Sequence, residues 1–185
     1  MSEVNQLQLL QRCEAGEAGA IEELVHTYQL PTYRLALSIL DDPAEAEEAA
    51  QDALVTALDR LATYRGEAAF TTWLHALTLN LCRMRLRKRR ARQRLVGLLQ
   101  EVFRLQAQPP HTEAEFQRIE SDAALWSAIR RLADLQREVI VLRYYHDLPI
   151  VNISQVTGVS ERTVHNRLRA AHKRLRILLK EKEQS

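Results

Sequence analysis

Residues 147–175 read DLPIVNISQVTGVSERTVHNRLRAAHKRL, and this stretch predicts two helices joined by a tight turn. Pro149 suits the start of the first helix, because a proline at the first helical position gives up no hydrogen bond. Gly158 suits the turn, since a left-handed backbone costs glycine little. Ser160 can then cap the second helix by accepting a backbone N–H. The pattern is that of a helix-turn-helix.

The second helix of this motif has two chemically different faces. Its apolar residues recur at spacings of 4, 3 and 4, and they are Val164, Leu168, Ala171 and Leu175. Residues 160–180 contain seven bases and one acid. A charged face is often only a solvated face, but within a helix-turn-helix it favours DNA binding.

The position of each polar residue on that helix predicts its role. In a helix-turn-helix, the first residues of the second helix contact base edges in the major groove; here they are Glu161, Arg162, Thr163, His165 and Asn166. Basic residues further along are expected to contact phosphate; here they are Arg169, Lys173 and Arg174.

A second basic segment, residues 83–94, reads RMRLRKRRARQR and contains eight bases and no acid. Phe70 and Trp73 precede it by about three helical turns, and Asn80 by less than one. Aromatic side chains beside a basic track suit single-stranded nucleic acid, since bases stack on the rings and phosphates follow the charge. The alternative is that Phe70 and Trp73 are core residues, and we expect this of at least one of them.

Composition and charge place the chain among helical proteins with two kinds of partner. Its 185 residues carry a net charge of only +2, but residues 1–60 hold 12 acids and 3 bases, whereas residues 61–108 hold 2 acids and 10 bases. This segregation predicts partners of opposite electrostatic preference, one of them nucleic acid. Five glycines and five prolines leave little material for the turns of an all-β fold.

The apolar periodicity predicts an all-α protein of two small helical domains, an N-terminal helical bundle and a C-terminal helix-turn-helix domain. The predicted division is residues 1–94, a flexible linker over 95–118 with room for a short helix at 95–104, and residues 119–185. Pro31 is expected to interrupt or restart a helix, whereas Asp42-Pro43 is expected to begin one. A further helix is predicted over about 71–90.

The N-terminal aromatic and basic residues also match a family pattern. The sequence Tyr64-Arg65-Gly66-x-x-x-Phe70-x-x-Trp73-Leu74, followed by Asn80 and Arg83, strongly resembles the second conserved region of bacterial extracytoplasmic-function (group 4) sigma factors, of the sigma-70 family. Residues 132–175 are similar to the fourth region of that family. The resemblance covers about residues 17–94 and 122–180, in the family's order.

The resemblance implies a function and its partners. The chain would direct core RNA polymerase to promoters, reading the −35 element as duplex and opening the −10 element, with an anti-sigma factor as a further partner. A docking helix would contact the β′ clamp helices through Glu47, Glu48, Gln51, Asp52 and Val55, and the β flap would also be contacted. The opened −10 strand would be held by Tyr64, Arg65, Gly66, Phe70, Trp73, Asn80, Arg83 and Arg87.

Two other classes of function compete with this one. An ordinary helix-turn-helix regulator that acts without entering polymerase would explain the C-terminal third but not the aromatic and basic segments. An enzyme is disfavoured, because there is no Gly-rich phosphate loop and no paired carboxylates with a partner base. Cys13, His26, His75 and Cys82 lack metal-ligand spacing, so neither a metal nor a cofactor is expected.

The chain is expected to be cytoplasmic, with no membrane insertion. No uncharged run reaches the roughly 20 residues needed to span a bilayer. The first residues, MSEVNQLQLL, lack the basic and apolar regions of a signal peptide.

Overall fold

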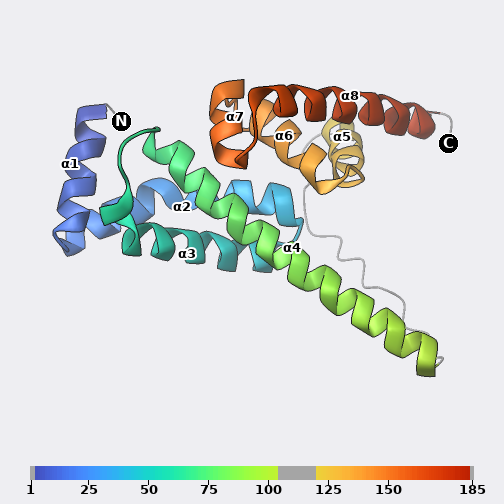
Figure 1. Cartoon of the computed structure of the whole chain (residues 1–185), viewed down its shortest axis with the longest axis horizontal. Coiled ribbons are helices and arrows are strands. Elements are labelled where there is room, and N and C mark those ends of the chain that lie inside the picture. Colours follow the sequence, from blue (N-terminus) through green and yellow to red (C-terminus); the bar gives the residue numbers. More distant parts are fainter. Residues whose placement is uncertain (1–2, 104–119, 184–185) are drawn as a thin grey trace.

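The computed structural model describes residues 3–103 and 120–183, and the regular elements in these two segments are all helical, as the sequence predicts. The N-terminal domain contains α1 (Glu3–Glu14), α2 (Ala18–Leu40), α3 (Pro43–Asp59), the 3-10 turn η1 (Leu61–Thr63) and α4 (Phe70–Phe103). The C-terminal domain contains α5 (Glu120–Arg130), α6 (Asp134–Tyr144), α7 (Ile150–Thr157) and α8 (Glu161–Glu183). Figure 1 shows the second group of helices packed along α2 and the first half of α4.

The start of α3 follows the sequence prediction, whereas the course of α2 does not. Asp42 caps α3, its Oδ1 accepting from the Glu45 N–H at 2.9 Å, and Pro43 takes the first helical position. Pro31 was expected to interrupt α2, but the helix runs through it. An internal proline costs a helix about 3 kcal/mol, and here burial on both sides offsets that cost, since Leu24 and Leu35 are fully buried.

Helix α4 is longer than the sequence predicts. It was expected to end near residue 90, with a separate short helix at 95–104, but it continues without a break to Phe103. The physical reason is that residues 91–103 contain no proline and one glycine, so nothing in them stops a helix. The remainder of the predicted linker, residues 104–118, lies outside the described residues.

The helix-turn-helix has the predicted geometry. Gly158 adopts a φ of 71°, and its N–H donates to the Ser154 carbonyl at 2.9 Å, which closes α7. The Ser160 hydroxyl accepts from the Thr163 N–H at 3.3 Å at the start of α8. The predicted inward face of α8 is buried, and it consists of Val164, Leu168, Ala171 and Leu175, joined by Leu178.

Two apolar clusters hold the helices together, and one of them is shared by the two domains. The first lies within the N-terminal domain and includes Leu24, Tyr28, Leu54, Phe70 and Leu74. The second unites residues of both domains, among them Leu35, Ile39, Leu79, Cys82, Leu86, Ile129, Leu132, Val139, Leu142 and Ile153. The domains are therefore closed on one another through a continuous core.

Polar contacts accompany the apolar ones between the two domains. The Asn152 amide of α7 donates to the Thr72 hydroxyl of α4 at 3.3 Å, and Arg137 of α6 donates to the Ile39 carbonyl at 3.1 Å. The rings of His75 and His146 meet edge to face, with centroids 5.5 Å apart. In the segments described here, no helix has the length and apolarity needed to cross a membrane.

The buried histidine pair makes the stability of the closed form depend on pH. The pKa of His75 and of His146 is lowered to about 4, by burial in both cases and, for His146, also by the nearby His75 and Arg34. Because both values lie below the ~6.5 of an unfolded histidine, the unfolded chain binds more protons between pH 4 and 6.5. The free energy of unfolding is therefore expected to fall as the pH drops from 7 towards 5.

A double variant, His75→Gln with His146→Gln, tests this origin of the pH dependence by chemical denaturation at several pH values. Its stability is expected to change less between pH 7 and 5 than that of the wild type. His172→Gln, at an exposed position of α8, is the matched control and keeps the wild-type slope. An unchanged slope in the double variant would show that other groups cause the dependence.

Candidate nucleic-acid interface

Three aromatic side chains form one group at the start of α4. The ring centroids of Tyr64 and Phe70 are 5.6 Å apart, and those of Tyr64 and Trp73 are 5.3 Å apart. Burial raises the pKa of the Tyr64 phenol, so its hydroxyl stays a hydrogen-bond donor, here to the Ala68 carbonyl at 2.6 Å. The loop before α4 is thereby fixed against the helix.

The members of this predicted strand-binding set differ in exposure. Phe70 is 1 % exposed and packs against Tyr28, which confirms the expectation that at least one of the two aromatics belongs to the core. In the closed form, Phe70 supports its neighbours and has no surface to offer a base. Tyr64 and Trp73 are half-buried, while Arg65, Gly66, Asn80 and Arg87 are exposed.

Arg83, another predicted strand-binding residue, is engaged by the other domain. Its Nε and Nη2 donate to the two carboxylate oxygens of Glu138 on α6, at 2.9 Å and 2.7 Å. This bidentate pairing raises the pKa of the guanidinium above its ordinary value. Glu138 is 1 % exposed, so this ion pair is buried on the acidic side.

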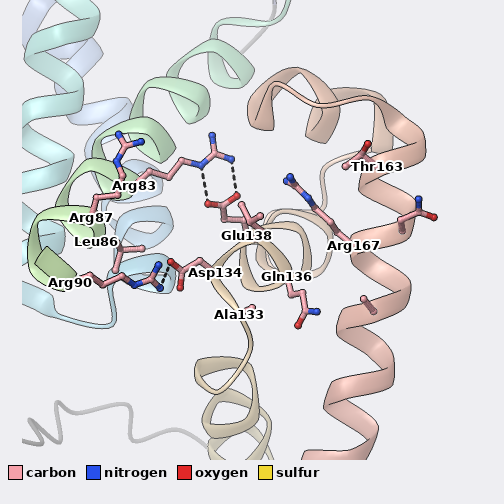
Figure 2. A pocket seen from close by; sticks show the side chains of 13 residues that line it. Arg83, Leu86, Arg87, Arg90, Ala133, Asp134, Gln136, Glu138, Thr163 and Arg167 are labelled. Carbon is pink, nitrogen blue, oxygen red and sulfur yellow. Dashed lines mark hydrogen bonds and ion pairs between the residues drawn. The ribbon is translucent and has the colours of Figure 1, made fainter. Parts of the chain in front are cut away.

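The pair lies beside a cleft between α4, α6 and α8 (Figure 2). The cleft has a volume of about 720 Å³ and is lined by Arg83, Arg87 and Arg90 of α4 and by Thr163, Asn166 and Arg167 of α8, together with residues of α6. Arg90 forms a further ion pair with Asp134 across it. The structure thus brings the two predicted DNA-binding helices to opposite walls of one basic cleft.

The predicted duplex-reading face of α8 is mostly open to solvent. Its exposed members are Glu161, Arg162, His165, Asn166, Arg169, Lys173 and Arg174, and Thr163 is half-buried. The Asn166 Oδ1 accepts from Arg169 Nη2 at 2.6 Å. Arg162 and Lys173 stand near the beginning and the middle of the helix, so they are suited to test base and phosphate contacts separately.

The predicted docking face of α3 is exposed, and α4 helps to order it. Glu47, Glu48, Gln51, Asp52 and Val55 all lie on the solvent side, and Val55 is 58 % exposed. Arg85 of α4 pairs with Glu48 at 2.8 Å and with Asp52 at 2.6 Å. One arginine of the basic run therefore holds two of the acidic side chains in place.

Sequence reasoning missed Glu138 and Arg85 as residues of these surfaces. Arg85 could have been singled out, because it alternates with Arg83 and Arg87 along the basic run and so points to a different side of the helix. Glu138 carries no such signal, since its partner is 55 residues away in the sequence.

No metal site emerges from the part of the chain that the structure describes. It contains no group of three or more histidine, cysteine or acidic side chains placed to hold an ion. Cys13 and Cys82 are free, buried thiols that belong to different apolar clusters. Burial raises the pKa of the Cys82 thiol to about 12, which keeps it protonated.

Comparison with known proteins decides the family. Two family models match in series: Sigma-70 region 2 over residues 24–92 and Sigma-70 region 4 over residues 122–175. The ECF RNA polymerase sigma factor SigM of Mycobacterium tuberculosis is 30% identical over 172 residues, which cover 93% of this chain and 83% of SigM. The chain belongs to the extracytoplasmic-function (ECF) family of RNA polymerase sigma factors.

Other relatives of this sigma factor match over most of their length. The ECF RNA polymerase sigma factor SigW of Bacillus subtilis is 26% identical over 178 residues, covering 93% of this chain and 95% of SigW. Among solved structures, CnrH in complex with the cytosolic domain of CnrY has a TM-score of 0.67 at 22% identity, covering 94% of this chain and 96% of that one. The sigma factor RpoE in complex with the anti-sigma factor NepR from Bartonella quintana has a TM-score of 0.66 at 21% identity, covering 86% and 96%.

The geometry of α8 predicts different effects for its two ends in this sigma factor. Arg162→Ala is expected to weaken promoter recognition by about 1–3 kcal/mol at one or two base positions of the −35 element, the range for a lost base contact. Lys173→Ala is expected to weaken all promoters about equally and to lower the salt dependence, as loss of a phosphate contact does. The measurement is holoenzyme binding to a promoter and to its single-base variants at several salt concentrations. A changed base preference for Lys173→Ala with none for Arg162→Ala would reverse the orientation assigned to α8.

Proposed function

We propose that this sigma factor directs core RNA polymerase to its promoters by duplex recognition of the −35 element through α8 and by opening of the −10 element at α4. The observation that carries the proposal is the order of the two matched regions, 24–92 and 122–175, each with an exposed polar face where the function needs one. A duplex-reading helix and a strand-binding helix in one chain are what promoter opening requires.

The strand-binding part of the proposal rests on the first turns of α4. Asn80 follows Trp73 by seven residues, or two helical turns, so both side chains lie on one side of the helix. An exposed amide can donate to and accept from the edge of a base flipped out of the duplex. Tyr64 and Trp73 would flank that base, Arg65 and Gly66 would form the rim of its pocket, and Arg83 and Arg87 would hold the phosphates. Phe70 would support the pocket from below.

The acidic face of α3 is proposed to dock on the β′ clamp helices of the polymerase. Its exposed Val55 offers an apolar centre, and the surrounding acids Glu47, Glu48 and Asp52 would pair with basic groups of the partner. We further propose that the C-terminal domain contacts the β flap, that an anti-sigma factor binds this chain, and that it acts in the cytoplasm. The solved RpoE is in complex with the anti-sigma factor NepR, which supports the anti-sigma assignment.

The role proposed here is not catalytic, because a sigma factor positions polymerase and leaves the chemistry to it. The competing function, a regulator that binds operator DNA without entering polymerase, uses α7 and α8 alone. It leaves the aromatic group at Tyr64 and the exposed face of α3 without a purpose, and no observation favours it.

Strand opening separates the two functions, and Asn80→Ala tests it. Extruding a base costs a few kcal/mol, so removal of a group that holds the extruded base is expected to shift the promoter towards its closed form. The variant is expected to show less permanganate-detected melting at the −10 element while its affinity for core polymerase stays near that of the wild type. A promoter selected from a library with reconstituted polymerase supplies the template, and a premelted −10 bubble is expected to restore part of the activity.

Gln93→Ala provides the matched control, since Gln93 is also an exposed amide on α4 but lies thirteen residues beyond Asn80, on another side of the helix. It is expected to melt the promoter normally. If Asn80→Ala melted the promoter as well as this control, the base-holding pocket would be misplaced. If the wild type failed to bind core polymerase at all, the simple regulator would be the better description.

A further inference from the structure

The ion pair between Arg83 and Glu138 joins an acid of one domain to an arginine of the other domain that is predicted to bind the promoter strand. Both carboxylate oxygens accept from the guanidinium, in the two-pronged geometry that a phosphate would also use. A carboxylate buried to 1 % exposure needs such a partner, because an unpaired charge is strongly disfavoured away from water.

Little of Arg83 remains for a DNA strand in the closed form, since its side chain is only 24 % exposed. Its Nε and Nη2 donate to Glu138, Nη1 donates to the Asn80 Oδ1 at 3.4 Å, and Nη1 and Nη2 both lie 3.5 Å from the Thr157 carbonyl of α7. Each of its three nitrogen atoms therefore has a partner within the protein. Asn80, proposed to hold the flipped base, is also engaged by this arginine.

The position of α7 and α8 adds a steric obstacle to the electrostatic one. Asn152 of α7 donates to Thr72 of α4, next to Trp73, so α7 covers the helix beside the aromatic group. Thr163 and Asn166 of the duplex-reading helix line the cleft opposite Arg87. In this arrangement a DNA strand along α4 and a duplex on the first turn of α8 would compete with the contacts between the domains.

A second arginine, Arg167, could form an ion pair with Glu138 once Arg83 has moved away. Arg167 of α8 belongs to the same domain as Glu138 and lines the same cleft, and its Nη1 is buried with no hydrogen-bond partner among the described residues. Figure 2 shows Glu138 between Arg83 on one side and Arg167 on the other. Separation of the domains would remove Arg83 but leave Glu138 and Arg167 on neighbouring helices of one domain, so the carboxylate would still have a cation beside it.

We propose that the closed form is autoinhibited: Glu138 acts as a phosphate mimic that withholds Arg83 from the promoter strand, and Arg167 receives Glu138 when the domains open. The competing ligand is by class a single-stranded nucleic-acid backbone. This inference rests on the proposed contact between Arg83 and the promoter strand. The experiments are therefore chosen so that failure of the autoinhibition and failure of the strand contact give different results.

The first experiment measures binding of the full-length chain to a fluorescein-labelled, random-sequence single-stranded DNA 12-mer by anisotropy. Glu138→Gln keeps the shape of the side chain and removes its charge, so it is expected to raise the affinity roughly tenfold by releasing Arg83. Asp147→Asn is the matched control. It removes the same charge from an exposed position of the same domain, where a φ of 50° suits asparagine, and it is expected to bind as the wild type does.

Three outcomes of this measurement have distinct meanings. If Glu138→Gln bound no more tightly than Asp147→Asn, autoinhibition by Glu138 would be overturned and the proposed function would stand. Addition of Arg83→Gln to Glu138→Gln is expected to remove the gain, because the released arginine makes the contact. If the double variant kept the gain, Arg83 would not hold the strand, and the assignment of that residue in the proposed function would fail.

The role of Arg167 is tested by the same assay in two backgrounds. In the wild type, Arg167→Gln is expected to lower affinity severalfold, because the open form loses its partner for Glu138. In the Glu138→Gln background, the same change is expected to have no effect. Equal losses in both backgrounds would make Arg167 a direct DNA contact and would overturn the exchange.

A reversible disulfide between the two domains tests the same proposal without depending on the folding of the charge variants. Thr72→Cys with Asn152→Cys places two thiols where the native side chains are in hydrogen-bond contact across the domains. The oxidised protein, with the cross-link verified by mass spectrometry, is expected to lose affinity for the 12-mer and to regain it after reduction. Thr72→Cys alone is expected to be insensitive to oxidation. If the locked protein bound as well as the reduced one, the closed form would not be inhibitory.

Discussion

The closed arrangement of this sigma factor depends on the ion pair that neutralises one buried carboxylate. Glu138 lies at the junction of two helical domains and is almost fully withdrawn from water, so it requires a cation within reach. Arg83 supplies it from α4. The same guanidinium stands on the face of α4 that is proposed to follow the promoter strand. The contact that holds the domains together and the contact proposed for DNA thus draw on one side chain, and this shared use couples the shape of the protein to its function.

The basic run of α4 also forms ion pairs with acidic residues of the N-terminal half of the chain, on the side of α4 that faces α3. The basic run does not form a single uniform surface, because its residues point around the helix. Arg85 turns towards α3 and pairs with Glu48 and Asp52, whereas Arg87 remains exposed. Surface ion pairs of this kind stabilise a fold by only about 0–1 kcal/mol. Their contribution here is to order an acidic face, while Arg87, on another side of the helix, stays available to an anionic partner.

Much of the fold could be predicted because its signals are local. Asp42-Pro43 starts a helix, Gly158 and Ser160 define the turn, and the apolar spacing of α8 gives its buried face, all through interactions within a few residues. The errors were also local in origin. Pro31 carries a strong stop signal that burial of its neighbours overrides, and residues 91–103 lack any stop signal, so α4 runs on to Phe103.

The residues of the candidate site could be predicted from the sequence, but their contacts with the other domain could not. Tyr64, Trp73 and Asn80 could be grouped from their spacing, and the core position of Phe70 could be weighed as an alternative. The pairing of Arg83 with Glu138, 55 residues away, depends on how the two domains meet, and no periodicity encodes that. The shared apolar cluster across the domains was missed for the same reason, since each half of it looks like the core of its own domain.

The most direct test of the central claim is the separation of the two domains in solution, measured by electron–electron resonance between spin labels on Glu22→Cys of α2 and Arg176→Cys of α8. Both positions are exposed, and they belong to different domains. We expect one short, narrow distance distribution for the free chain, and a longer one once core polymerase and a promoter with an opened −10 strand are bound. The same distribution in the free and the bound chain would contradict the account, because Arg83 would then have to hold the strand without leaving Glu138.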